Sequence, residues 1–121
     1  MIGYVTVGTN DLPRAAAFYD ALFGEMGGRR FMEMERFIAW SSGADKAGFS
    51  VAMPYDGKTA TVGNGVMVAL QAESPEQVDA LYKKAMSLGA TDEGAPGLRG
   101  GTFYAAYFRD LDGNKLNFFH M

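Results

Sequence analysis

The sequence predicts an α+β fold in which two tandem βαβββ modules form a curved, cupped mixed sheet. Three observations support this prediction. A strand, a helix and further strands follow one another twice along the chain. The two halves match at an offset of 63 residues, which places Tyr4 on Met67 and Tyr19 on Tyr82. An irregular segment rich in Gly, Pro, Asn and Thr separates them at residues 54–65, as a linker between repeats would.

The irregular segment also sets the expected limits of the modules. At 121 residues the chain has the length of one domain. We therefore expect a single domain over residues 1–121, with the first module at 1–53, the linker at 54–65 and the second module at 66–121.

The first half begins with a predicted strand at residues 2–7 (IGYVTV), which are β-branched and aromatic between glycines. The next segment predicts a helix, because apolar side chains recur at helical spacing. Asn10 or Asp11 can cap this helix, and its first turn tolerates Pro13. The stretch FMEMERFIAW alternates poorly before it ends in a strong strand, so strands are predicted at residues 37–40 and 49–53.

The second half repeats this order. Residues 66–71 predict a strand, and Ser74 followed by Pro75 predicts the start of a helix with an apolar face. The stretch APGLRGG predicts a glycine-rich loop. Two further strands are predicted at residues 102–108 and 115–120, joined by the turn RDLDGN.

One helix in each module cannot cover both faces of its sheet. The other face must be buried by the second module, by another subunit or by a ligand. Nine Phe, six Tyr, one Trp and eight Met are available to line a concave, apolar cavity, or simply to fill the core.

The composition excludes several classes of function. With 11 Lys and Arg against 14 Asp and Glu there is no basic stripe, so we expect no nucleic-acid or membrane partner. The absence of cysteine excludes disulfides, thiol nucleophiles and zinc–thiolate sites. The N-terminus shows no signal peptide, and we expect a cytoplasmic protein. The single histidine, His120, excludes any mechanism that needs two.

Three segments, DLPRAAAFYDALFG, DGKTATVGNG and YAAYFRDLDGNKLN, carry a resemblance that extends over essentially the whole chain. Together they are similar to the vicinal oxygen chelate superfamily of glyoxalases, extradiol dioxygenases, fosfomycin-resistance enzymes and bleomycin-binding proteins. The resemblance implies paired βαβββ modules, usually in a homodimer. In the enzymes it implies a divalent metal held by His, Gln and Glu from the first and last strands of each module.

The positions that match these ligands carry other residues here. Tyr4 and Met67 stand where the resemblance implies histidine, and Asn117 stands where it implies glutamate. Residues 49–53, which match the remaining ligand strand, contain no His, Glu, Gln or Asp. Divalent metals of this kind need several converging oxygen or nitrogen donors. We therefore expect no metal cofactor, while the resemblance still implies a pocket.

The same three residues become candidates for ligand binding. Tyr4 and Met67 occupy matching places in the two repeats, so we expect them to face each other across the cavity, either lining it or filling the space of the metal. Asn117 can orient a polar group of a ligand through its amide. Alternatively, it forms a hydrogen bond with Tyr4 that satisfies both buried groups.

Four further residues are candidates. Trp40 and Phe49 would form an aromatic wall for a planar ligand, or pack in the core. Tyr104 follows the glycine-rich loop, where members of the superfamily contact substrate. Arg99 in that loop could pair with an anionic group, or remain a solvated surface side chain. The DLDG run at residues 110–113 fits a hairpin turn better than a calcium loop.

We therefore expect a metal-free small-molecule-binding protein of the bleomycin-resistance type, with a partly aromatic or apolar ligand. The alternative is an enzyme, either a glyoxalase-like lyase or dioxygenase with atypical metal ligands, or a metal-free catalyst. In the metal-free form Tyr4, Glu33 or Glu35 would act as acid or base. A third possibility is a regulatory or interaction module with a filled cavity.

Overall fold

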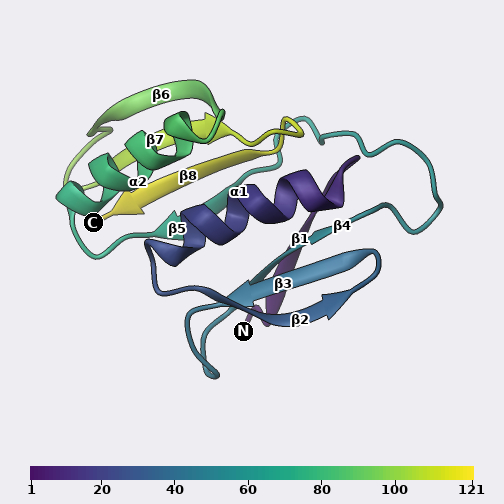
Figure 1. The fold of residues 1–121 in the computed structure, drawn as a ribbon. Coiled ribbons are helices and arrows are strands. Elements are labelled where there is room, and N and C mark those ends of the chain that lie inside the picture. Colours follow the sequence, from purple (N-terminus) through teal and green to yellow (C-terminus); the bar gives the residue numbers. More distant parts are fainter. The chain divides into compact units, whose positions relative to one another are not determined.

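A computed structural model describes residues 1–121 as two compact units, Met1–Val62 and Gly63–Met121. Each unit has the order strand, helix and three strands, and each contains one four-stranded mixed sheet with one helix (Figure 1). This arrangement confirms the predicted α+β class with tandem βαβββ modules.

The first unit consists of β1 (Tyr4–Gly8), α1 (Leu12–Gly24), β2 (Arg29–Met34), β3 (Phe37–Ser41) and β4 (Gly48–Ala52). Its strands lie in the order β1-β4-β3-β2. The first strand runs parallel to β4, and the other neighbours are antiparallel. The outer strands of the sheet are therefore β1 and β2.

The second unit consists of β5 (Val68–Gln71), α2 (Pro75–Ser87), β6 (Thr91–Leu98), β7 (Tyr104–Arg109) and β8 (Lys115–His120). Its strand order, β5-β8-β7-β6, and its pattern of parallel and antiparallel neighbours repeat those of the first unit. The last strand has the bounds that the sequence predicts.

Both helices begin at side-chain caps that the sequence contains. The Asp11 carboxylate accepts a hydrogen bond from the Arg14 backbone N–H at 3.1 Å, and the Ser74 hydroxyl accepts one from the Gln77 N–H at 3.1 Å. Of the two residues that could cap α1, Asp11 is the cap. Asn10 instead accepts a hydrogen bond from the Ala60 N–H at 2.6 Å.

The helix-covered face of the first sheet is aromatic. Tyr19 and Phe23 of α1 both pack against Phe49, with ring centroids 4.7 Å and 5.1 Å apart. Trp40 lies beside them, 5.8 Å from the Tyr19 ring. Burial of these large apolar side chains is the main stabilising contribution expected in this unit.

The repeat is exact over the helices but not over the whole module. The bounds of α1 and α2 differ by 63 residues at both ends. In the parallel pairs, however, Thr6 lies beside Ser50 while Ala69 lies beside Asn117, so the offset has grown to 67. Ser50 and Asn117 are therefore equivalent positions of the two sheets.

Two strands differ from the sequence-based expectation. The poorly alternating stretch before residue 37 contributes to β2, and the first four of the seven residues of the expected loop APGLRGG lie in β6. Both are edge strands with irregular pairing, one register shift in β2 and two in β6. An edge strand tolerates Pro96 and several glycines because only one side of its backbone needs partners. Irregular edge strands lack the alternation that reveals a strand in sequence.

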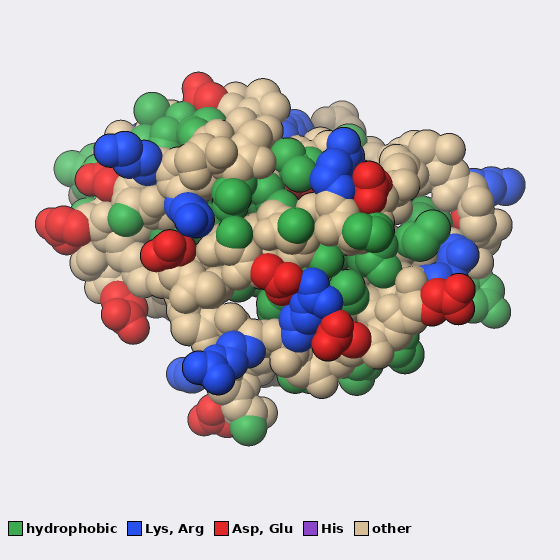
Figure 2. Space-filling model, in the orientation of Figure 1, with side chains coloured by type: hydrophobic (Ala, Val, Ile, Leu, Met, Phe, Trp, Pro, Cys, Tyr) green, Lys and Arg blue, Asp and Glu red, His purple; other side chains and the backbone are tan.

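The charged surface is mixed. Acidic and basic side chains are interspersed over the face shown in Figure 2, with hydrophobic side chains between them. None of the helices is long and apolar enough to span a membrane.

Candidate ligand-binding site

Each sheet has one face covered by the helix of its own unit, and we call the opposite face its open face. Strand alternation assigns residues to the two faces. In the first unit Phe49 lies under α1, so Ser50 and its neighbour Thr6 belong to the open face. In the second unit the Tyr104 hydroxyl donates a hydrogen bond to Asp79 of α2. Tyr107, three residues further along β7, therefore belongs to the open face, as does Asn117, which pairs with it.

The open face of the first unit has a satisfied polar centre. The Ser50 hydroxyl donates to the Val5 carbonyl at 2.9 Å and is hydrogen-bonded to the Thr6 hydroxyl at 2.6 Å. Ser50 is fully buried. This position therefore needs no external partner.

The open face of the second unit has an unsatisfied polar centre. Asn117 is only 1% exposed, and its Oδ1 atom has no hydrogen-bond partner. Its neighbour in β5 is Ala69, which offers no side-chain donor where the first unit has Thr6. A buried acceptor without a donor costs about 1–3 kcal/mol, so such a group calls for a functional explanation.

Two cationic side chains lie near the ring of Tyr107. The guanidinium carbon of Arg99 is 5.5 Å from the ring centroid, and the Lys115 ammonium nitrogen is 5.7 Å from it. Tyr107 is on the inner strand β7, which lies between β8 and β6. Lys115 is on β8, and Arg99 directly follows β6. Neither cation has an ion-pair partner, whereas Arg109 on the same face is paired with Glu93 at 2.6 Å.

Arg99 is exposed, and its guanidinium is also held by contacts within its own unit. Its guanidinium donates to the Ala95 carbonyl. Added Cβ atoms at Gly94 and Gly97 would lie 3.3 Å and 3.0 Å from its terminal nitrogens. The backbone N–H of Arg99 also donates to the Phe103 carbonyl at 2.8 Å. The two glycines thus leave the space in which this cation lies across β6.

Three of the predicted ligand contacts lie on the helix-covered faces of their sheets. Trp40 and Phe49 are in the core beneath α1, not on an open face, and the Trp40 indole N–H donates to Asp20 at 2.8 Å. Arg30 donates to the same carboxylate, and this hydrogen bond holds the pKa of Asp20 below its usual value. Tyr104 lies on the helix side of its sheet, where the Asp79 carboxylate raises the pKa of its hydroxyl.

The remaining candidates lie as follows. Tyr4 is on the open face of the first unit, 60% exposed, with an edge-to-face contact to Phe37. Met67 comes just before β5 rather than within it and is 41% exposed. The His120 ring nitrogen is 3.1 Å from the Ala72 carbonyl at the end of β8. Tyr107 and Lys115 were not among the candidates, because only the strand register places them beside Asn117.

The donors present do not fit the metal that the family's enzymes use. No three His, Cys, Asp or Glu side chains come together to form a metal site. The positions that would supply ligands carry a phenol at Tyr4, a thioether at Met67 and a neutral amide at Asn117. At the position equivalent to Asn117, the Ser50 hydroxyl is already bonded within the sheet. Hard divalent ions need several anionic or imidazole donors, and these four side chains are of neither type.

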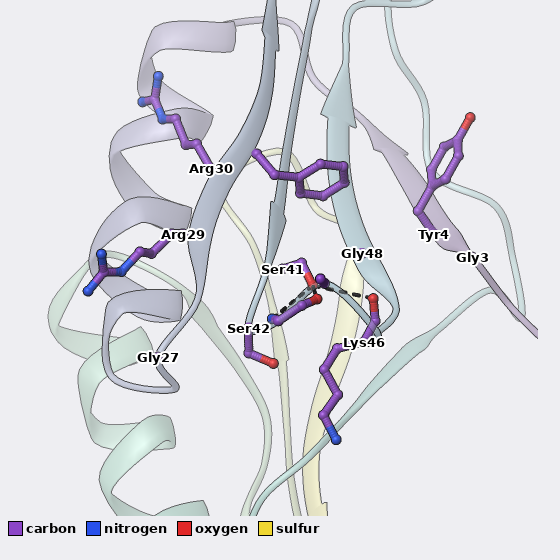
Figure 3. Close-up of a pocket in the computed structure, with 12 residues that line it drawn as sticks. Gly3, Tyr4, Gly27, Arg29, Arg30, Ser41, Ser42, Lys46 and Gly48 are labelled. Carbon is purple, nitrogen blue, oxygen red and sulfur yellow. Dashed lines mark hydrogen bonds between the residues drawn. The ribbon is translucent and has the colours of Figure 1, made fainter.

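A separate pocket of about 710 Å³ lies at one end of the first sheet, lined by Tyr4, Phe31, Lys46, Gly48 and their neighbours. Figure 3 shows that the side chains of Arg29 and Arg30 are directed away from Tyr4 and Gly48. The Phe31 ring lies against Gly48, where an added Cβ would approach it to 3.1 Å. Its lining also includes the polar side chains of Ser41, Ser42 and Lys46, but no buried side-chain polar atom of this pocket is left without a hydrogen-bond partner.

The paired βαβββ modules define a class of proteins, and the comparisons with known proteins identify it. Residues 1–118 match the model of the Glyoxalase/Bleomycin resistance protein/Dioxygenase superfamily. The chain belongs to this superfamily, which confirms the resemblance found in the sequence. No curated protein matches it.

Several solved structures are similar over their whole length. A glyoxalase/bleomycin resistance protein from Albidiferax ferrireducens T118 is 37% identical, with a TM-score of 0.90 over 100% of this chain and 98% of that chain. A family enzyme from Burkholderia phytofirmans PsJN (21% identity, TM-score 0.79, 97% and 95% covered) shares the fold. Lactoylglutathione lyase from Agrobacterium tumefaciens also shares the fold. It is 19% identical, with a TM-score of 0.74 over 98% of this chain and 92% of that chain.

Proposed function

We propose that the protein binds a small molecule at the open face of its second unit, without a metal of the kind used by the family's enzymes. One observation carries this proposal. The Oδ1 atom of Asn117 is a buried acceptor with no donor, on the face of its sheet opposite α2. A ligand N–H or O–H group that reached this atom would remove the cost of leaving it unpaired.

The first unit supports this interpretation by contrast. At the equivalent position, Ser50 is satisfied by Val5 and Thr6. The side chain at this sheet position is thus fully hydrogen-bonded in one module, whereas in the other it has an acceptor without a partner. A polar side chain placed in the core for folding alone would be expected to have its partners within the fold, as Ser50 does.

The donor chemistry favours a binding protein over an enzyme within the superfamily. The superfamily includes both glyoxalases and bleomycin resistance proteins. The residues at the expected ligand positions do not fit a hard divalent ion. Nor does Glu33 support a metal-free acid or base, because its carboxylate accepts a hydrogen bond from Arg30 at 2.7 Å.

A thermal-shift screen tests the proposal. We expect compounds from a metabolite library to raise the melting temperature of the wild-type protein by the same amount with and without EDTA. Asn117→Ala should respond less to the same compounds, while Ser50→Ala at the equivalent position should respond as the wild type does. Stabilisation that requires an added divalent metal would contradict the proposal.

A further inference from the structure

The charges and the register of the second unit indicate which ligand its open face recognises. This inference rests on the proposed binding function and adds the chemical class and orientation of the ligand. Three cross-strand pairs follow one another along β7 and β8 on this face: Arg109 with Lys115, Tyr107 with Asn117, and Ala105 with Phe119. The face therefore changes from cationic, through an amide, to apolar along one direction.

The cationic end is only partly neutralised within the protein, because Glu93 is the one carboxylate that interacts with both Arg109 and Lys115. Arg109 is paired with Glu93, but Lys115 and Arg99 have no ion-pair partner. The chain as a whole carries a net charge of −3, so this positive charge is local and does not reflect the composition. Two unpaired cations beside one aromatic ring favour an anion over a neutral or cationic group.

The apolar end is aromatic. Phe119 stacks on Phe103, with ring centroids 5.6 Å apart and an interplanar angle of 24°. Both rings are partly exposed. Together with the ring of Tyr107, they offer aromatic surfaces that suit a planar ligand better than a branched aliphatic one.

The amide lies between these two ends. Lys115 and Asn117 are two residues apart on the same face of β8. At the usual rise of a strand, their Cα atoms are about 7 Å apart. A para-substituted benzene ring spans a similar distance between its two substituents. An anionic group near Lys115 would thus place a para hydroxyl or amine near the unpaired Oδ1 atom.

We infer that the open face of the second unit binds a planar aromatic anion that carries a hydroxyl or amine donor. Its anionic group lies towards Lys115 and Arg99, its donor reaches Asn117, and its apolar edge lies towards Phe119. Because Asn117 is buried, a neighbouring side chain must move as the ligand enters. Lys115, with its flexible stem, is the neighbour on the same strand face that can do so.

Isothermal titration with four simple probes tests this inference. The probes are 4-hydroxybenzoate, its neutral amide 4-hydroxybenzamide, its cationic analogue 4-hydroxybenzylamine, and benzoate, which lacks the donor. We expect 4-hydroxybenzoate to bind most tightly. Loss of the charge or of the hydroxyl should each weaken binding by about tenfold, as expected for a lost charge-assisted or buried hydrogen bond.

Variants assign the two halves of the ligand to their partners. Arg99→Gln and Lys115→Gln should each weaken 4-hydroxybenzoate by about three- to tenfold and leave 4-hydroxybenzamide unchanged. Asn117→Ala should remove the advantage of 4-hydroxybenzoate over benzoate. Lys83→Gln, which removes one positive charge from the exposed side of α2, serves as the matched control and should bind as the wild type does.

Two results would overturn the inference. One is equal affinity for the anionic and neutral probes, or no effect of Arg99→Gln and Lys115→Gln. The other is the absence of binding by any probe. Neither result decides the proposed function, because a ligand of another class would still stabilise the wild-type protein more than Asn117→Ala in the thermal-shift screen.

Discussion

Replacing Asn117 with leucine is expected to raise the free energy of unfolding by about 1–3 kcal/mol, although it alters a fully buried residue. The substitution removes a buried acceptor that has no donor and replaces it with an apolar side chain of similar size. The same change should weaken ligand binding by at least about tenfold, because the hydrogen-bond acceptor is lost. Urea-induced unfolding followed by tryptophan fluorescence measures the first effect, and isothermal titration the second.

The matched control is the equivalent position of the first sheet. Ser50 is satisfied by two hydrogen bonds, so Ser50→Ala should lower the free energy of unfolding by about 0.5–1.5 kcal/mol and leave ligand binding unchanged. A loss of stability in Asn117→Leu would show that Asn117 is a satisfied structural residue. Such a result would remove the main argument for a ligand at this face.

Replacing Phe49 with alanine is expected to lower the free energy of unfolding by about 3–5 kcal/mol, the usual cost of truncating a buried phenylalanine. The Phe49 ring is 5% exposed and packs against Tyr19 and Phe23 of α1. Its removal leaves a cavity beneath the helix that rigid aromatic neighbours cannot fill. Equilibrium unfolding in urea measures the effect.

Phe31 provides the comparison within the same unit. It is 56% exposed, so Phe31→Ala should change the free energy of unfolding by about 1 kcal/mol or less. The two substitutions remove the same atoms and differ only in burial. If Phe49→Ala were as stable as Phe31→Ala, the assignment of Phe49 to the core would be wrong, and the expectation of an aromatic ligand wall would regain support.

The fold was largely predictable because it repeats. The caps and apolar faces of both helices are visible in the sequence. The match between the halves predicts the position of α2 from that of α1. The strand at Lys115–His120 alternates clearly and was predicted with its observed bounds. The edge strands β2 and β6 were not, because bulges and glycines interrupt their alternation.

The candidate site was predictable only in part. Two residues of the proposed site, Asn117 and Arg99, were candidates from the sequence, because a polar residue in an apolar strand and an arginine in a glycine-rich loop are visible there. Trp40 and Phe49 were assigned to a ligand wall as one alternative, and only the strand face excludes it. A shift of one residue reverses the face of every side chain in a strand.

Tyr107 and Lys115 could not have been placed beside Asn117 from the repeat alone. The second module has four more residues between its first and last strands, which pair in parallel, than the first module has, as the change of offset from 63 to 67 shows. An alignment at the constant offset therefore does not bring Ser50 onto Asn117. Only the hydrogen-bonded register of the strands shows that these two residues are equivalent, and that one is satisfied while the other is not.

The metal content of the purified protein tests the central claim most directly. Protein prepared without chelators, in medium supplied with Mg, Mn, Fe, Ni and Zn, would be analysed by inductively coupled plasma mass spectrometry. The account predicts far less than one equivalent of any divalent metal, with no difference between the wild type, Tyr4→Phe and Asn117→Ala. One equivalent of a single metal in the wild type, lost in either variant, would contradict it.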